Sequence, residues 1–109
     1  WGTGSPRREF IFSDDIANAC YMLLEASINN KDLPINIGVG TDISIKELAE
    51  KITHIVGYSG TIRWDKSKPD GAPRKLLDNS RIKSIGWKPQ TNLEIGLKST
   101  YQWYLDNIV

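Results

Sequence analysis

The first half of the chain places apolar residues at the period of an amphipathic helix. Between residues 14 and 27 the apolar positions follow the i, i+3, i+4, i+7, i+8 spacing and form a single stripe. Ser13 precedes this segment and is a suitable N-cap, because its hydroxyl can accept a hydrogen bond from the first turn. Cys20 belongs to the stripe, so we expect its thiol in the core and without a reactive role. The pattern therefore predicts a helix over residues 14–27.

Three further helices are predicted along the chain. Ser44 and Glu47 have the spacing of a capping box ahead of a second apolar stripe. That stripe ends at Gly57, which is suited to the left-handed conformation that closes many helices. A short helix is expected over about residues 79–85, and the last helix follows Thr91, its expected N-cap.

Three short strands are predicted between the helices, because branched and aromatic residues cluster at 9–12, 34–37 and 61–65. Residues 29–32 have the composition of a turn that separates the first helix from the second strand. The mixed order of helices and strands does not make a complete doubly wound sheet. We therefore expect one small α/β domain over residues 1–109, with about four helices and three short strands, packed beside another domain.

Length and composition limit the chain to one globular domain. Its 109 residues are 39% hydrophobic and 25% charged, which is ordinary for a soluble protein. No apolar run approaches the roughly 18 residues of a membrane span. A single cysteine cannot form an internal disulfide, and a cytoplasmic location is expected. The chain begins at Trp1 and not at a methionine, so we interpret it as a piece of a larger protein.

Charge is unevenly distributed, although the net charge is only +1. Residues 1–62 carry five basic and eight acidic side chains, whereas residues 63–83 carry seven basic and three acidic ones. The second segment is therefore a local electropositive region. A region this small suits one anionic ligand better than a long polyanion, so we expect no nucleic acid partner.

A stiff polar loop lies inside this electropositive segment. Two prolines and one glycine prevent a helix at residues 69–73, and Asp70 stands at the apex of the resulting turn. Arg74 and Lys75 follow directly. A cationic loop of this kind is suited to hold an anion, and a surface loop with solvated charges is the equally supported alternative.

The familiar motifs of catalysis and cofactor binding do not occur in the sequence. The Gly-x-Gly pairs at residues 2–4 and 38–40 have neither the third glycine nor the strand-to-helix setting of a dinucleotide fingerprint. His54 lies off the apolar stripe of its predicted helix, so we expect it to be exposed and not paired with Cys20. One histidine and one cysteine do not make a zinc site. We therefore expect no catalytic residue, no cofactor-binding residue and no metal site within the chain.

Five segments occur together in a characteristic order: WGTGSPRREF at 1–10, NIGVG at 36–40, SIKELA at 44–49, KPDGAPRKLLD at 68–78 and STYQWY at 99–104. They resemble the GDP-L-fucose synthase family, also called GDP-4-keto-6-deoxy-D-mannose 3,5-epimerase/4-reductase, among the extended short-chain dehydrogenases. The resemblance covers essentially the whole chain but only the C-terminal third of the enzyme. It implies a substrate-binding domain that packs against a Rossmann domain and binds a nucleotide-sugar in the cleft between them.

The resemblance implies that four residues lie at the substrate. Trp1, Arg8 and Asp70 match positions that contact the GDP-sugar in the family, and Lys75 matches a basic residue near the same ligand. Their chemistry agrees with these roles. An indole can stack, a guanidinium can bind a diphosphate through two donors, and a carboxylate can accept hydrogen bonds from a base or sugar. A lysine adds a second cation at the phosphate end.

Each of these residues also has a simpler interpretation. Trp1 could lie at the edge of the chain without any site. Arg8 could form a surface ion pair with Glu9 or Asp14. Asp70 could only cap its own turn. The site interpretation is preferred because these residues lie in segments that match the family.

The resemblance also implies an activity and a cofactor. The enzyme uses NADPH to convert GDP-4-keto-6-deoxy-D-mannose to GDP-L-fucose, by epimerisation at C3 and C5 and reduction at C4. Its catalytic groups and its NADPH site lie upstream of the matched third, so we expect this chain alone to be inactive and its parent to be a homodimer. The alternatives are a domain of another nucleotide-sugar epimerase, dehydratase or reductase, and a freestanding anion-binding module.

Overall fold

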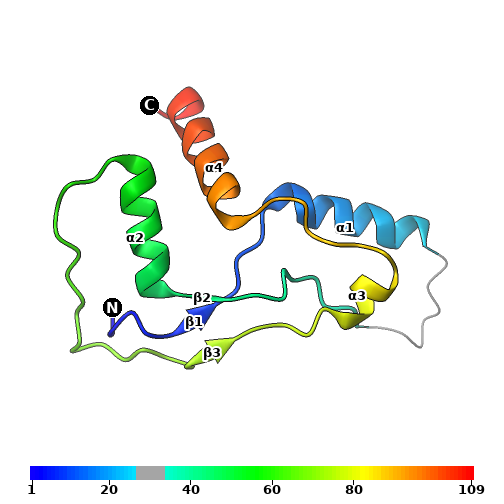
Figure 1. Ribbon diagram of the computed structural model, residues 1–109, viewed down its shortest axis with the longest axis horizontal. Coiled ribbons are helices and arrows are strands. Elements are labelled where there is room, and N and C mark those ends of the chain that lie inside the picture. The colour runs from blue at the N-terminus through cyan, green and yellow to red at the C-terminus, as the bar shows by residue number, and fades with distance from the viewer. Residues whose placement is uncertain (27–33) are drawn as a thin grey trace.

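The computed structural model describes residues 1–26 and 34–109 (Figure 1). The elements in these residues are, in order, β1 (Arg7–Arg8), α1 (Ser13–Glu25), β2 (Ile43–Ser44), α2 (Ile45–Val56), β3 (Arg74–Lys75), α3 (Ser80–Ser84) and α4 (Leu93–Asn107). The predicted α/β class, with four helices and three short strands, is therefore confirmed. The turn predicted at residues 29–32 and the predicted end of the first helix at residue 27 lie outside the described residues.

β1 is the central strand of the sheet, which has the order β2-β1-β3. It pairs antiparallel with β2, where Arg8 lies opposite Ile43. It pairs in parallel with β3, where Arg7 lies opposite Arg74 and Arg8 lies opposite Lys75. The sheet therefore places the two arginines of β1 next to the basic pair of β3, although the two pairs are far apart in the sequence (Figure 1).

The strand positions predicted from composition are wrong. None of the segments 9–12, 34–37 and 61–65 is a strand in the structure. Branched and aromatic side chains favour a pleated, half-buried surface, but a strand also needs a neighbouring backbone with which to pair. In the described part of the chain, ladder pairing occurs where residues 7–8 run beside β2 and β3. Composition does not reveal where such a neighbour will be.

The predicted boundaries of α2 are confirmed by its caps. The Ser44 hydroxyl accepts a hydrogen bond from the Glu47 amide at 3.1 Å, and the Glu47 carboxylate accepts one from the Ser44 amide at 2.9 Å. The hydrogen bonds from Ser44 hold the pKa of the Glu47 carboxyl below its usual value. The helix ends at Gly57, which has a left-handed φ of 71°.

The N-caps predicted for α1 and α4 are wrong. α1 begins at Ser13 itself, and its N-cap position is Phe12, which forms no side-chain cap. The N-cap of α4 is Asn92, whose side-chain oxygen accepts a hydrogen bond from the amide three residues later at 2.9 Å. The amide of the preceding Thr91 donates to the Asp15 carboxylate at 3.0 Å, so residue 91 belongs to the approach to the helix.

The core lies between α1, α3 and the segment that leads to α4. Its buried apolar side chains are Ala19, Ile82 and Trp87. The partly buried residues packed against them are Ile11, Met22, Leu23, Ile35 and Ile37. Cys20 is exposed, so the prediction of a core thiol is wrong. The buried face of α1 contains Asp15 and Ala19, and it is therefore rotated from the stripe that the apolar residues alone define.

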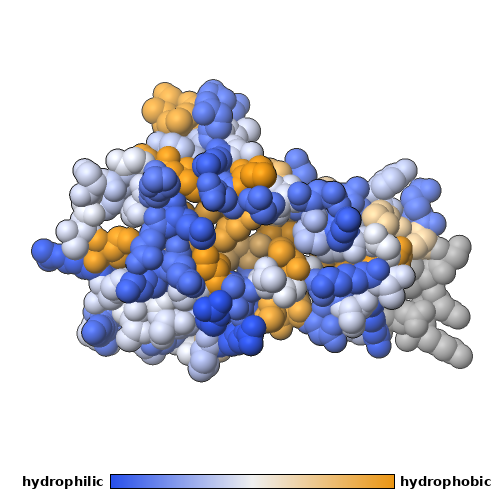
Figure 2. Space-filling view, in the orientation of Figure 1, coloured by the Kyte–Doolittle hydropathy of each residue, from blue (hydrophilic) through white to orange (hydrophobic). Residues whose placement is uncertain are grey.

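The described part of the chain is thin and leaves apolar side chains uncovered. Its principal extents are 51 × 35 × 18 Å and its radius of gyration is 16.8 Å, whereas a compact domain of this length has about 13 Å. Leu24 is 84% exposed and Ile108 is 62% exposed. Apolar side chains also reach the surface between α2 and α4 (Figure 2). Exposed apolar surface of this extent is typical of a face that packs against another domain.

Asp15 connects the first turn of α1 to the segment before α4. The residue is 4% exposed, and its carboxylate oxygens accept hydrogen bonds from the amides of Gln90 and Thr91, each at 3.0 Å. Because Asp15 is buried, these two bonds replace the water that its carboxylate loses on folding. Asp15 therefore fixes the start of α4 relative to α1.

We predict that Asp15→Ala lowers the free energy of unfolding by about 2–4 kcal/mol, because it removes two hydrogen bonds to a charged acceptor and leaves two amides unpaired. Urea unfolding followed by tryptophan fluorescence measures the change. Asp14→Ala is the matched control: Asp14 is the exposed neighbour of Asp15, and its substitution is expected to change stability by less than about 0.5 kcal/mol. Equal losses in the two variants would contradict the role assigned to Asp15.

Candidate functional site

Two loops that are far apart in the sequence, residues 1–6 and 65–73, lie side by side beyond the sheet (Figure 1). We call them the loop pair. The amide of Gly2 donates a hydrogen bond to the carbonyl of Asp65 at 2.8 Å, which joins the two backbones directly. Trp1 and Asp70 belong to the loop pair, and the other two predicted substrate-binding residues lie in the strands that follow it.

Asp70 is held by Thr3, which lies on the opposite loop. The Thr3 amide donates to Asp70 Oδ1 at 2.6 Å, and the Thr3 hydroxyl donates to Asp70 Oδ2 at 2.8 Å. The amide hydrogen bond is the larger cause that holds the pKa of the Asp70 carboxyl below its usual value. The carboxylate is therefore ionised at neutral pH. Its hydrogen bonds to Thr3 join two loops, so Asp70 does more than cap its own turn.

Arg8 lies between Lys75 and the turn that carries Asp70. Arg8 and Lys75 are direct partners across β1 and β3. The Arg8 Nη1 atom donates to the carbonyl of Arg7 at 2.7 Å. A methyl group built on Gly71 would lie 3.9 Å from Arg8 Nη2, so the guanidinium passes close to the turn. The structure therefore brings one guanidinium and one ammonium group to the same edge of the loop pair.

The ion pair considered as an alternative for Arg8 is not formed. Among residues 1–26 and 34–109, no carboxylate forms a salt bridge with its guanidinium. The Glu9 carboxylate accepts hydrogen bonds from the amides of Gly40 and Leu77 instead. Arg8 therefore keeps donors that no described carboxylate occupies, and a bound anion could use them.

Trp1 is the most exposed large aromatic residue of the loop pair, with 84% of its surface accessible. The Lys68 Nζ atom lies 5.8 Å from the centroid of its ring, within the range of a cation–π contact. Lys75 is also exposed. Arg8, Lys75 and the turn of Asp70 thus lie together, and the Trp1 indole lies on the same loop pair, next to Lys68. Such a set can bind a ligand that has an anionic group and several hydrogen-bond donors.

Asp42, which no sequence pattern indicated, pairs with an arginine from each of two strands. Its side chain is 4% exposed. Oδ1 accepts a hydrogen bond from Arg7 Nε at 2.8 Å, and Oδ2 accepts one from Arg74 Nε. These bonds, with that from Arg7 the largest cause, hold the pKa of the Asp42 carboxyl below its usual value. The partners lie 35 and 32 residues away in the sequence, so no local spacing could have revealed the cluster.

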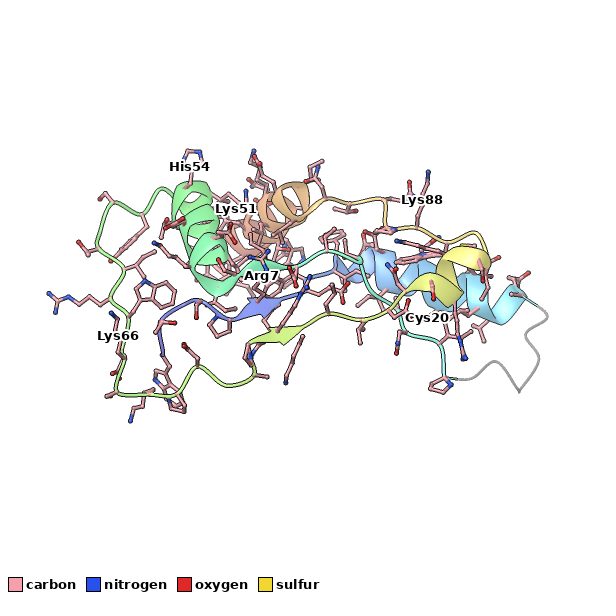
Figure 3. The ribbon with its side chains drawn as sticks, turned by 60° about the horizontal axis from the view of Figure 1, so that its bottom comes forward. Arg7, Cys20, Lys51, His54, Lys66 and Lys88 are labelled. Carbon is pink, nitrogen blue, oxygen red and sulfur yellow. The ribbon has the colours of Figure 1, made fainter. Side chains whose placement is uncertain are left out.

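The cluster of Asp42, Arg7 and Arg74 reduces the local positive charge that the sequence predicts. Arg74 belongs to the electropositive segment, but its charge is compensated by Asp42. Arg7 shares that carboxylate and also pairs with Glu47 at 3.6 Å, and it lies near the centre of the molecule (Figure 3). The cations without a carboxylate partner in the described residues include Arg8 and Lys75, and both lie beside the loop pair. Of the four basic residues of β1 and β3, Arg7 and Arg74 are therefore bound to a carboxylate of the fold. Arg8 and Lys75 are available to bind an anion.

Cys20 and His54 do not form a site. Cys20 is on α1, whereas His54 projects from the outer side of α2, as predicted for an exposed imidazole (Figure 3). Residues 1–26 and 34–109 contain no group of three His, Cys, Asp or Glu residues that could hold a metal ion. No helix in these same ranges has both the length and the apolar character needed to cross a membrane.

Comparison with known proteins finds relatives along the whole chain. Residues 1–38 match the NAD dependent epimerase/dehydratase family. GDP-L-fucose synthase 1 of Arabidopsis thaliana is 49% identical over 108 residues, which cover 99% of this chain and 33% of that protein. GDP-L-fucose synthase of Escherichia coli strain K12 is 46% identical over 114 residues, covering 98% of this chain and 36% of that protein.

A solved structure shares both the sequence and the fold. GDP-mannoheptose C4 reductase from Campylobacter jejuni, with NADP bound, superposes with a TM-score of 0.81 and 45% identity, over 96% of this chain and 33% of that chain. The chain therefore spans about a third of the length of its relatives. The resemblance to the C-terminal third of GDP-L-fucose synthases is confirmed, and the relatives carry the names of enzymes.

We predict that Asp42→Asn lowers the thermal unfolding midpoint at pH 7 and weakens its dependence on acid pH. The folded pKa of Asp42 lies below its ordinary value of 3.8. Its ion pairs therefore stabilise the fold fully above about pH 5, and this contribution is lost as the pH falls through the folded pKa. The difference between wild type and variant should be largest at pH 7 and shrink below about pH 4.

Circular dichroism melts at pH 7, 4 and 3 measure this difference. Asp106→Asn is the matched control, because Asp106 is exposed and accepts a hydrogen bond from the Gln102 amide group of its own helix. A difference between wild type and Asp42→Asn that stays constant over this pH range would show that the lost charge pairs are not its cause.

Proposed function

We propose that this chain, which is similar over its whole length to the C-terminal third of GDP-L-fucose synthases, is the substrate-binding part of such an enzyme. The proposed enzyme uses NADPH to convert GDP-4-keto-6-deoxy-D-mannose to GDP-L-fucose, by epimerisation at C3 and C5 and reduction at C4. The observation that carries the proposal is the meeting of Arg8, Lys75 and an ionised Asp70 at the loop pair.

Each side chain has a distinct role in the proposed complex. Arg8 binds the diphosphate, because its planar guanidinium presents parallel donors that match phosphate oxygens. Lys75 supplies a second cation at the phosphate end, in register with Arg8. Asp70 accepts hydrogen bonds from donors of the base or the sugar. Trp1 offers an exposed ring for stacking or as a wall of the site.

The remaining parts of the proposed enzyme lie in sequence beyond this chain. The relatives are about three times as long, and one of them was solved with NADP bound. We place the NADPH site and the catalytic groups in a Rossmann domain that covers the exposed apolar side chains of this chain. The proposal also includes a homodimeric parent in the cytoplasm.

A reductase that acts on a different GDP-sugar is the second candidate. The similarity to GDP-mannoheptose C4 reductase, at 45% identity, is close to that with the fucose synthases. The same loop pair would serve both enzymes, because the diphosphate is common to their ligands. Turnover of GDP-4-keto-6-deoxy-D-mannose against a GDP-4-keto-heptose, assayed with the full-length protein, distinguishes the two.

A freestanding anion-binding module is less well supported than either enzyme. Such a module must bury its own apolar residues, whereas here the radius of gyration is 16.8 Å and Leu24 is 84% exposed. A domain that is covered by the rest of a longer chain accounts for both values.

We predict that Arg8→Ala in the full-length enzyme raises the KM for the GDP-sugar roughly ten- to a hundredfold, because charge-assisted hydrogen bonds to the diphosphate are lost. Arg8→Lys keeps the charge but loses the planar fork, so its KM should rise by less. The KM for NADPH should hardly change in either variant. Steady-state kinetics with each substrate varied in turn measures these constants.

Arg63→Ala is the matched control for these variants. Arg63 is an exposed arginine of the same electropositive segment, outside the loop pair and without an ion pair among the described residues. Its substitution should leave the KM for the GDP-sugar within about twofold of wild type. An unchanged sugar KM in folded Arg8→Ala would remove Arg8 from the site and count against the proposed function.

We predict that the chain of residues 1–109 alone does not oxidise NADPH in the presence of GDP-4-keto-6-deoxy-D-mannose. The groups that transfer hydride and protons belong, in the proposal, to the remainder of the enzyme. Absorbance of the reduced cofactor, compared with a control without protein, measures the rate. Oxidation that increases in proportion to the concentration of the chain would contradict this division of roles.

A further inference from the structure

The hydrogen bonds around Asp70 form a network in which Thr3 and Ser5 take part. The Thr3 hydroxyl has one proton and donates it to Asp70 Oδ2 at 2.8 Å, because an ionised carboxylate can only accept. The Ser5 hydroxyl, 2.8 Å from the Thr3 oxygen, can donate to it, and the Ser5 side chain also helps to hold the pKa of the Asp70 carboxyl below its usual value. The Ser5 amide donates to the same oxygen at 3.2 Å. The Thr3 donors thus reach the carboxylate directly, and the Ser5 amide reaches the Thr3 oxygen that is bonded to it.

Thr3 restrains both oxygens of Asp70 at once. Its amide reaches Oδ1 at 2.6 Å and its hydroxyl reaches Oδ2 at 2.8 Å. One bond would leave the carboxylate free to rotate, whereas two bonds to different oxygens fix its plane. The close approach requires Gly2, which has a φ of 72° and where a methyl group would lie 2.1 Å from Asp70 Oδ1. The Thr3 hydroxyl is the larger of two side-chain contributions to the lowered pKa of the Asp70 carboxyl, and the Ser5 side chain is the smaller.

The network leaves the carboxylate open to a ligand. Thr3 and Asp70 are both exposed, so their hydrogen bonds replace bonds to water and contribute little to stability. Thr3 fills two of about four acceptor positions of the carboxylate, and the Ser5 side chain makes a smaller contribution. The other positions lie in a fixed plane, next to the turn that the Arg8 guanidinium passes. A pair of fixed acceptors matches two neighbouring N–H or O–H donors on one ligand.

We propose that Thr3 is a positioning residue, which fixes the carboxylate plane of Asp70 so that its open acceptor positions meet paired hydrogen-bond donors of the nucleotide-sugar. The inference rests on the proposed function, in which Asp70 contacts the ligand. Thr3 itself does not touch the ligand and acts through Asp70.

Steady-state kinetics of the full-length enzyme test this role in four variants: Thr3→Val, Thr3→Ser, Asp70→Ala and the double variant Thr3→Val/Asp70→Ala. Valine has the shape of threonine but no hydroxyl. Thr3→Val should therefore raise the KM for the GDP-sugar about five- to twentyfold, with kcat within about twofold of wild type. Thr3→Ser restores the hydroxyl and should stay within about twofold of wild type. Thr61→Val, at an exposed threonine outside the loop pair, controls for the substitution itself.

The double variant separates positioning from a general structural effect. Without Asp70 there is no carboxylate to orient, so adding Thr3→Val to Asp70→Ala should raise the KM by less than about twofold. An equal rise in both backgrounds overturns the inference. A normal KM in Thr3→Val, while Asp70→Ala raises it, overturns the inference and leaves the proposed function intact. A normal KM in folded Asp70→Ala overturns both.

Discussion

The arrangement of the sheet and of the candidate site depends on the carboxylate of Asp42. β1 and β3 run in parallel with Arg7 opposite Arg74, and two like charges in that position repel each other. Asp42 bonds to both guanidinium groups, and Glu47 lies 3.6 Å from Arg7, so two carboxylates balance the two arginines and make the pairing favourable. The same register places Arg8 beside Lys75. A residue that lies outside the loop pair thus determines where the two available cations meet.

The helices could be predicted from the sequence where their ends are decided by neighbouring residues. The capping box of Ser44 and Glu47 and the left-handed Gly57 are local features, and they define α2 correctly. The strands could not, because a ladder requires a distant backbone in register, and the apolar segments form no ladder within the described residues. The exposure of Cys20 was also missed, since the buried face of α1 includes a hydrogen-bonded carboxylate that an apolar pattern does not count.

The candidate site could also be predicted from the sequence only in part. Family motifs indicated Trp1, Arg8, Asp70 and Lys75, and the structure places Arg8 beside Lys75 and close to the turn that carries Asp70. What the motifs could not indicate is how the residues are held. The bonds of Thr3 to Asp70 span 67 positions in the sequence, and no spacing rule connects partners at that distance. The sequence indicated which side chains the site contains. The structure was needed to show the hydrogen bonds that hold them.

The two arginines of β1 are adjacent but have different partners, because successive side chains of a strand point to opposite faces. Arg7 reaches the Asp42 carboxylate, and Arg8 passes the turn at Gly71. Removing one residue from the leading loop would slide the strand by one position and exchange the two faces. Arg8 would then face Asp42, and the acidic Glu9 would take the place of Arg8 beside the turn at Gly71. The length of residues 1–6 is therefore as tightly constrained as their composition.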